Sequence, residues 1–245
     1  MRSLRHYNAK DKMIIISDVQ TYASKEALYI AVRNAEDRVI DDAMLRSLPY
    51  TVPSYIHHHE WEVRTRSLQR FLQEINKFRK PLKILDIGCG NGWLSARLFN
   101  EGHIVTAVDL NLTELEQAER VFGTHERLRW VYADILIDEI IKAPQDVIVF
   151  SASCQYFPDI KLLIEKVKSL LDKNGSVHLL DSFFYPDHEI STARERTLQY
   201  YSQLGFPGMA SHYFHHKISD LKKLGFKRRF PTFFTGKNNP QWWVV

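Results

Sequence analysis

One glycine-rich segment constrains the fold of this chain more than any other feature. Ile84–Ser95 reads ILDIGCGNGWLS, in which an apolar run ends at Asp86 and three glycines follow at every second position. Glycines at this spacing favour a sharp turn with unusual backbone dihedrals, which lets a ligand approach the backbone closely. A helix that begins directly after the turn offers free N–H donors and a partial positive charge. The segment therefore predicts a strand, a ligand-binding turn and a helix.

The spacing of the glycines narrows the kind of ligand. Dinucleotide-binding turns read G-x-G-x-x-G and bring a pyrophosphate to the helix N-terminus. This turn reads G-x-G-x-G, and Asp86 stands two residues before its first glycine. A carboxylate beside the turn repels a pyrophosphate, because like charges repel each other. The pattern therefore favours a ligand that carries an ammonium group.

Strand-like and helix-like segments alternate through the middle of the chain. Strand candidates begin at residues 83, 104 and about 129, and two more are Asp146–Phe150 and Val177–Leu180. Ile160–Leu171 has apolar residues at helical spacing, and Thr113 is expected to cap a helix that Gly123 ends. This alternation predicts right-handed βαβ units and a parallel sheet with helices on both faces.

The first 79 residues show a different pattern. Helices are predicted over Ser24–Asn34, Asp37–Leu48 and His58–Phe78. The last of these has an apolar stripe made of Trp61, Leu68, Phe71, Leu72, Ile75 and Phe78. We therefore expect a helical extension or lid at residues 1–79, packed on a Rossmann-like domain at residues 80–245.

The C-terminal part predicts an antiparallel pair of strands. A helix is expected to end at Gly205 and another to cover Ile218–Leu224, and strands are expected at Phe226–Phe234 and Gln241–Val245, joined by a GKNNP turn. The predicted fold class is α/β, with a doubly wound seven-stranded mostly parallel sheet, a C-terminal antiparallel hairpin and a helical N-terminal extension.

Composition excludes several classes of protein. Hydrophobic residues make up 44% of the 245 residues, which is ample for a packed core, and the net charge of +4 is far from that of a dedicated nucleic-acid binder. Two cysteines, Cys89 and Cys154, exclude a disulfide framework and a cysteine-rich metal module. The apolar run at Met13–Ile16 is too short for a signal peptide, and no stretch approaches the ~20 residues of a membrane span. We expect a cytoplasmic protein.

The segment at 84–95 resembles motif I of the class I (Rossmann-like) S-adenosylmethionine-dependent methyltransferases. It is particularly similar to the small-molecule group that includes ubiquinone- and menaquinone-pathway enzymes. The resemblance covers residues 80–182 well and 216–245 in outline, where LGF at 224–226 resembles the stretch before the family's C-terminal hairpin. It implies S-adenosyl-L-methionine as cofactor, with S-adenosyl-L-homocysteine as product. The implied reaction is methyl transfer to an O, N or C atom of a small-molecule acceptor.

The later motifs agree with this resemblance. Asp109 ends a strand 23 residues after Asp86, where an acid can bind both ribose hydroxyls. The resemblance implies that Leu110 packs on the adenine. It also implies that Asp134 binds the adenine amino group and that Ile135 lines the adenine ring. The segment at 146–159 resembles the fourth motif. The expected cofactor-binding residues are Asp86, Gly88, Cys89, Gly90, Asn91, Asp109, Leu110, Asp134, Ile135, Ser151 and Arg64.

The core motifs do not fix a catalytic residue. Where the group often has two histidines in the fourth motif, this chain has Gln155 and Tyr156. Methyl transfer from a sulfonium is an in-line displacement that mainly needs positioning, and a base is needed only for a protonated acceptor. The catalytic candidates are Tyr156 and His212, and the expected acceptor-side residues are Gln155, His59, His215 and His216. No metal is expected, because His212 and His216 lack an obvious third ligand.

Three points stay open at this stage. The role of Arg64 has two interpretations. It stands four residues after Glu60, so the two side chains can form a surface ion pair, or Arg64 can bind the carboxylate of the cofactor. Nucleic acid is not an expected partner, yet the basic run Lys227–Arg229 keeps a protein or RNA methyltransferase as one alternative. A non-catalytic S-adenosylmethionine-binding protein of the same fold is another. The N-terminal helices could also pair two chains as a homodimer.

Overall fold

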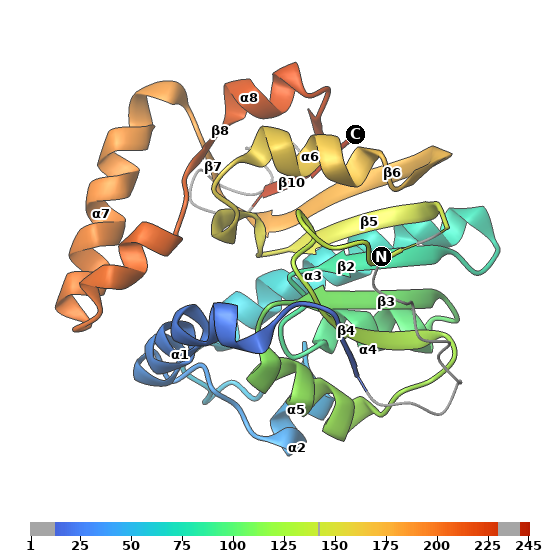
Figure 1. Cartoon of the computed structure of the whole chain (residues 1–245), viewed down its shortest axis with the longest axis horizontal. Helices are drawn as coiled ribbons and strands as arrows, with labels where there is room; N and C mark the ends of the chain where they lie inside the picture. The colour runs from blue at the N-terminus through green and yellow to red at the C-terminus, as the bar shows by residue number, and fades with distance from the viewer. Residues whose placement is uncertain (1–12, 142, 230–240) are drawn as a thin grey trace.

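Eight strands form one sheet in the order β1-β4-β3-β2-β5-β6-β10-β9 (Figure 1). The computed structural model describes residues 13–141, 143–229 and 241–245. The strands are β1 (Ile14–Ile15), β2 (Lys83–Ile87), β3 (Ile104–Asp109), β4 (Leu128–Tyr132), β5 (Gln145–Ser151), β6 (Leu171–Ser182), β9 (Lys227–Arg228) and β10 (Gln241–Val244). Strands β1 to β6 pair in parallel, whereas β10 is antiparallel to β6 and β9. The predicted doubly wound, mostly parallel sheet is confirmed.

The predicted strand count was wrong by one. Ile14 and Ile15 pair with Val131 and Tyr132, so β1 adds an eighth strand beside β4. Two residues cannot show the alternation by which a strand is recognised, and the partner strand supplies the hydrogen bonds that order them. The antiparallel pairing of β9 with β10 agrees with the predicted hairpin. Its expected GKNNP turn lies outside the described residues.

Eight α-helices accompany the sheet in the described part of the chain. They are α1 (Val19–Ala35), α2 (Asp42–Ser47), α3 (His58–Ile75), α4 (Trp93–Asn100), α5 (Leu112–Phe122), α6 (Ile160–Lys168), α7 (Ile190–Gln203) and α8 (Ile218–Lys223). Short 3₁₀ segments cover Asn76–Phe78, Cys154–Tyr156, Asp187–Glu189 and Pro207–His212. Strands β7 (Phe184–Tyr185) and β8 (His216–Lys217) form a small parallel pair.

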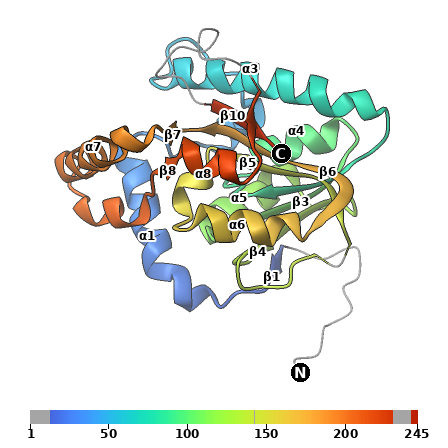
Figure 2. The same ribbon diagram turned by 90° about the horizontal axis from the view of Figure 1, so that it is seen from above.

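Helices cover both faces of the sheet (Figure 2). One buried cluster joins strand residues to α3, α4 and α5, through side chains such as Phe71, Leu94 and Leu115. The other joins the opposite face to α6 and α8, through Leu163 and Leu221. Because neighbouring residues of a strand point to opposite faces, a strand buried on both sides must be apolar throughout. The continuous apolar strands seen in the sequence therefore follow from a sheet with two covered faces.

Several predicted details were wrong. The second helix begins at Asp42 and not at Asp37, because Asp41 caps it by accepting a hydrogen bond from the Met44 amide at 2.7 Å. Asn111, not Thr113, caps α5. Phe78, which was assigned to the apolar stripe, is 54% exposed because the helix gives way to a 3₁₀ turn that carries its ring away from the sheet.

Helices α1 and α7 lie together at one end of the sheet in both views (Figures 1 and 2). Val32 of α1, Tyr201 of α7 and Met209 form a small buried cluster. The Tyr200 hydroxyl donates a 2.7 Å hydrogen bond to Glu36. Within the described ranges, no helix is both long and apolar enough to cross a membrane.

Candidate active site

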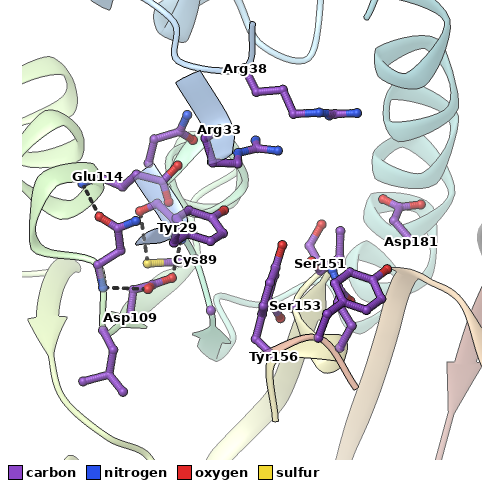
Figure 3. Close-up of a pocket in the computed structure, with 18 of the residues that line it drawn as sticks. Tyr29, Arg33, Arg38, Cys89, Asp109, Glu114, Ser151, Ser153, Tyr156 and Asp181 are labelled. Carbon is purple, nitrogen blue, oxygen red and sulfur yellow. Dashed lines mark hydrogen bonds between the residues drawn. The ribbon is translucent and has the colours of Figure 1, made fainter. Parts of the chain in front are cut away.

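A cavity of about 850 Å³ lies at the carboxyl ends of the parallel strands and under α1 (Figure 3). Ligands of open α/β sheets bind at this edge, because the loops that leave the strands converge there. Most of the residues predicted from the sequence line it. These are His59, Arg64, Gly88, Cys89, Gly90, Asn91, Asp109, Leu110, Asp134, Ile135, Ser151, Gln155 and Tyr156.

The glycine turn between β2 and α4 has the expected conformation. Gly88 and Gly92 have φ of 69° and 74°, in the left-handed region that other residues adopt at a cost. A Cβ on Gly88 would lie 2.4 Å from the Ser153 Cβ, and one on Gly92 would lie 2.4 Å from Trp130. The turn therefore needs glycine both for its backbone and for its close packing.

Asp109 is held by the backbone at the end of β3. Its Oδ2 accepts a 2.7 Å hydrogen bond from the Gly90 amide, and its Oδ1 accepts one of 2.9 Å from the Asn111 amide. Burial raises the pKa of Asp109, and the backbone N–H groups oppose that rise by stabilising the carboxylate. The carboxylate is thereby fixed in the wall of the cavity, and its ribose-binding role stays a prediction.

Asp134 links the end of β4 to helix α1. The Tyr22 hydroxyl donates a 2.9 Å hydrogen bond to its Oδ2, and the Leu136 amide donates one of 2.9 Å to its Oδ1. Burial, followed by the bond to Asp134, raises the pKa of Tyr22 to about 12, so the phenol stays a donor. This contact holds α1 over the end of the sheet where the adenine is expected.

Asp86 lies behind the glycine turn and does not line the cavity. It is 1% exposed, and its Oδ2 accepts a 2.6 Å hydrogen bond from the Ser95 hydroxyl of α4. Burial, with a smaller contribution from Asp109, raises its pKa to about 7. Its Oδ1 has no partner among the described residues. The direct cofactor contact expected for Asp86 stays a prediction.

Cys89 occupies the turn as a small neutral side chain. It is 7% exposed, and burial raises the pKa of its thiol well above the ordinary value. Such a thiol has little thiolate character and therefore little nucleophilicity. The structure thus favours a packing role for Cys89 in the turn over a role as a nucleophile.

A chain of alternating charges borders the cavity on the side of α1 and α3. Arg64 and Arg38 both contact the Glu60 carboxylate, at 2.8 Å and 2.7 Å. Arg38 and Arg33 lie 3.4 Å and 3.8 Å from Glu36. The buried Nε of Arg33 has no partner in the described part of the chain. Three arginines thus face two carboxylates here, and Glu114 of the same cavity wall adds a third acid near Arg33.

Tyrosines line the part of the cavity beyond Ser151. The ring of Tyr156 meets Tyr29 edge to face at 5.5 Å and Tyr213 at 6.0 Å, and Tyr201 continues the group. The buried Ser151 hydroxyl has no partner among the residues that the structure describes. Burial raises the pKa of Tyr156, so its phenol is protonated and able to donate a hydrogen bond.

The histidines of the C-terminal stretch do not line the cavity. The ring of His215 lies 2.9 Å from the Thr197 hydroxyl, and His216 Nε2 donates a 3.0 Å hydrogen bond to the Cys154 carbonyl. Burial lowers the pKa of His215 to about 4. His212 ends a 3₁₀ segment between the lining residues Met209 and Tyr213, but it does not itself line the cavity. The roles given to His212, His215 and His216 therefore stay predictions without support from their placement.

His59 and Gln155 both line the cavity, but they differ in exposure and in their hydrogen-bond partners. The ring of His59 is 84% exposed at the entrance, 3.2 Å from Glu62. The Gln155 side chain donates a 2.6 Å hydrogen bond to the Ala152 carbonyl, which fixes the amide beside Ser151. An acceptor-side role for the two residues agrees with their placement and stays a prediction.

Sequence reasoning missed seven charged residues of the cavity wall, which are Lys25, Glu26, Arg33, Glu36, Arg38, Glu114 and Asp181. Burial raises the pKa of Glu114 to about 7, with Arg33 as the main opposing charge. The spacing of Tyr29 and Arg33, four apart on α1, was the one available signal, since residues at this spacing share a helix face. Asp181 gave no signal, because one acid at the end of an apolar strand is common.

Comparisons with known proteins agree with this geometry. A family model described as a methyltransferase domain matches residues 84–175. The chain is 33% identical over 94 residues to an uncharacterised methyltransferase of Mycobacterium tuberculosis, covering 38% of this chain and 47% of that protein. It is 31% identical over 115 residues to a ubiquinone biosynthesis O-methyltransferase of Histophilus somni, covering 44% and 48%. The chain thus spans about half the length of the curated relatives it matches.

The solved structures agree on the fold. The magnesium protoporphyrin IX methyltransferase of Synechocystis, crystallised with S-adenosylhomocysteine, superposes with a TM-score of 0.59 at 15% identity. The superposition covers 93% of this chain and 98% of that one. This likeness supports the fold described above, a mostly parallel sheet with helices on both faces.

Proposed function

We propose that this chain, whose residues 84–175 match a methyltransferase domain, is a class I S-adenosylmethionine-dependent methyltransferase that acts on a small molecule. The methyl group passes from S-adenosylmethionine to an O, N or C atom of the acceptor. The observation that carries the proposal is that Asp109, Asp134 and the glycine turn, far apart in sequence, line one cavity of about 850 Å³. The similarity to a ubiquinone biosynthesis O-methyltransferase supports the same class.

The residues present fit this cofactor. Asp109 faces the cavity with a fixed carboxylate for the ribose hydroxyls, and Leu110 and Ile135 offer apolar surface for the adenine. Arg64 supplies a guanidinium for the carboxylate of the methionine end. The buried Arg33 Nε has no partner among the described residues, and buried polar groups are normally paired, so this wall has spare capacity for an acidic or polar ligand group.

The chain's own contribution is positioning and exclusion of water. The bound cofactor supplies a methyl group on a positively charged sulfur, which is already activated for displacement. Helix α1 covers the cavity and is held there by the hydrogen bond from Tyr22 to Asp134. The rings of Tyr29 and Tyr156 line the cavity with aromatic surface. A water-poor, preorganised site strengthens electrostatic interactions and brings the reacting atoms together.

The cavity favours a small acceptor over a protein or an RNA. Its aromatic part lies between α1 and α7, whose side chains pack together in a buried cluster. An RNA strand needs a long open groove with basic residues for its phosphates, and a peptide needs a groove or a sheet edge along which it can lie. The basic residues Lys227 and Arg228 lie in β9 and are not among the residues that line the cavity.

Two measurements on the full chain test the proposal. Calorimetric titration should show binding of S-adenosylmethionine and S-adenosylhomocysteine, and methyl-labelled cofactor should transfer label to the small-molecule fraction of a cell extract. Absence of binding to both nucleosides would refute the proposal. Binding without transfer to any fraction would favour the non-catalytic alternative, and label in RNA or protein would favour a macromolecular acceptor.

A further inference from the structure

Asp181 is a buried acid of the cavity wall to which no role has yet been assigned. It lies near the end of β6, is 8% exposed and lines the cavity. Its Oδ1 accepts a 2.6 Å hydrogen bond from the Ser67 hydroxyl of α3. Ser67 orients the carboxylate through one oxygen only, so the second oxygen remains for a partner in the cavity.

The backbone around Asp181 is unusual for a strand. Asp181 has φ of 54°, and Ala152, which follows β5, has φ of 52°. Ser151 of β5 pairs in register with Leu180 of β6, so these two left-handed residues lie side by side at the ends of neighbouring strands. A residue other than glycine in this conformation is strained by about 1–2 kcal/mol. Such strain tends to collect where side chains must be aimed at a ligand.

The position of Asp181 separates it from the expected cofactor contacts. Asp109 ends β3 and Asp181 lies near the end of β6, and the sheet order β3-β2-β5-β6 places three strand spacings between them. At about 4.8 Å per spacing, the two strands lie roughly 14 Å apart. Figure 3 shows the two acids on opposite sides of the cavity, with Ser151 and Tyr156 between them. Asp181 therefore lies across the cavity from the expected ribose ligand, on the wall that β6 and α3 form.

The charges near Asp181 favour a basic carboxylate. Burial raises the pKa of Asp181, Arg64 and the Ser67 hydrogen bond oppose this rise, and Glu60 adds to it. A carboxylate whose pKa is raised is a stronger base than a solvent-exposed one, which suits a general base.

We propose that Asp181 faces the transferring methyl group and accepts the proton of the acceptor. This inference rests on the proposed function. The acceptor oxygen attacks the methyl carbon, the O–C bond forms, and the C–S bond breaks with its electron pair remaining on sulfur. The hydroxyl proton passes to the free oxygen of Asp181 and later to water. The products are the methyl ether and the neutral thioether, so atoms and charge balance.

The same geometry specifies the class of acceptor. A base is needed only where the acceptor atom carries a proton before transfer. A neutral hydroxyl fits this environment, and the edge-to-face tyrosines offer flat surfaces for the ring that bears it.

The test needs no knowledge of the acceptor. Sinefungin carries a protonated amine where S-adenosylmethionine carries its sulfonium methyl, whereas S-adenosylhomocysteine carries only a neutral sulfur. If Asp181 faces the methyl position, the wild type should prefer sinefungin over S-adenosylhomocysteine by tenfold or more, as measured by calorimetry. Asp181→Asn should abolish that preference and leave the affinity for S-adenosylhomocysteine within threefold.

Controls make the result specific. Asn tolerates left-handed backbone, so Asp181→Asn should fold, which thermal unfolding checks. Asp187→Asn removes the same charge from a residue that is outside the cavity lining and should keep the preference. In the wild type the preference should also fall as the pH is lowered through the pKa of Asp181, and this fall should be absent in Asp181→Asn.

Each outcome decides a separate question. An unchanged sinefungin preference in Asp181→Asn overturns the role of Asp181. An equal loss of affinity for both nucleosides also overturns it, because Asp181 would then belong to the general cofactor contacts. If the wild type binds neither nucleoside, the proposed function itself fails.

Discussion

The Gly90 amide donates a 2.7 Å hydrogen bond to Asp109 Oδ2, which joins the turn after β2 to the end of β3. Residues 19 positions apart in sequence thus form one wall of the cavity. The bond fixes the carboxylate before any ligand arrives, and preorganisation of this kind lowers the entropic cost of binding. Asp109 is therefore both a part of the turn's structure and the expected ribose ligand.

Asp109→Asn should weaken binding of S-adenosylhomocysteine by about 10- to 100-fold. The variant keeps an oxygen for the Gly90 amide but loses the charge that strengthens bonds to the ribose hydroxyls, worth about 1.5–3 kcal/mol. Calorimetry measures the change. Asp172→Asn, which removes the same charge at an exposed site of β6, should bind as the wild type does. Equal affinity of Asp109→Asn and wild type would contradict the ribose-binding role.

Arg64→Ala should weaken binding of the same nucleoside by about tenfold or more. The guanidinium lines the cavity beside Glu60, and a charge-assisted pair with the ligand carboxylate contributes about 1.5–3 kcal/mol. Arg66→Ala, at an exposed position of the same helix, is the matched control and should have no effect. Unchanged affinity in Arg64→Ala would leave Arg64 as an ion pair with Glu60 only.

Gly92→Ala should destabilise the domain severely. The added Cβ would lie 2.4 Å from the Trp130 ring and 3.1 Å from the Ala118 Cβ, and the residue has φ of 74°. Both crowding and left-handed strain oppose the substitution, at a combined cost of about 3 kcal/mol or more. Urea unfolding measures it. Gly102→Ala, which has φ of 94° and open space around the added Cβ, separates strain from crowding and should cost less.

Phe71→Ala should lower the free energy of unfolding by about 3–5 kcal/mol, because it leaves a cavity in the core. Phe71 is fully buried and packs edge to face against His178 and Trp242, which joins α3 to β6 and β10. Phe78→Ala, at a ring that is 54% exposed, should change little. A small effect of Phe71→Ala would argue against our proposal that residues 1–79 form an extension packed on the sheet rather than a separate unit.

Acid should destabilise the protein partly through His178. Burial lowers the pKa of His178 to about 4 in the folded state, against about 6.5 in the unfolded chain. Between these values the unfolded chain binds the proton and the folded protein does not, so stability falls as the pH drops from 6.5 to 4. The loss is about 3 kcal/mol over that window.

His178→Asn should reduce this acid-induced loss, because the amide keeps an acceptor for the Trp242 indole N–H without titrating. Urea unfolding at pH 7 and pH 4 measures the difference. His188→Asn, at a side chain that is 81% exposed, should leave the loss unchanged. Identical acid sensitivity of wild type and His178→Asn would show that other groups cause the loss.

The strands and the cofactor motifs were predictable because they depend on local sequence. An apolar β-branched run such as Ile104–Asp109 forms a buried strand in most contexts, and the glycine turn has few alternative conformations. Helix ends were less predictable. Asn111 and Thr113 are both good caps, but Asn111 Oδ1 accepts from the Glu114 amide, whereas the Thr113 hydroxyl donates to Glu26.

The acceptor half of the cavity was not predictable from the sequence. Histidines 212, 215 and 216 formed a conspicuous cluster, yet two of them are buried in contacts with Thr197 and Cys154. Asp181 was inconspicuous, yet it lines the cavity with an unusual backbone. Local composition cannot report which faces converge, because convergence depends on the packing of α1, α3 and α7 against the sheet.

The sequence alone determined the alternation of strands and helices, the glycine turn and the acids at the strand ends. These features follow from backbone dihedrals, side-chain periodicity and the rule that parallel strands end on one edge. Tertiary structure alone decided that Asp86 lies behind the turn, that Tyr22 ties α1 to Asp134, and that Asp181 meets Ser67. Each of these contacts depends on how a helix packs against the sheet. The energy of that packing comes from many residues far apart in the chain, so no local stretch of sequence reports it.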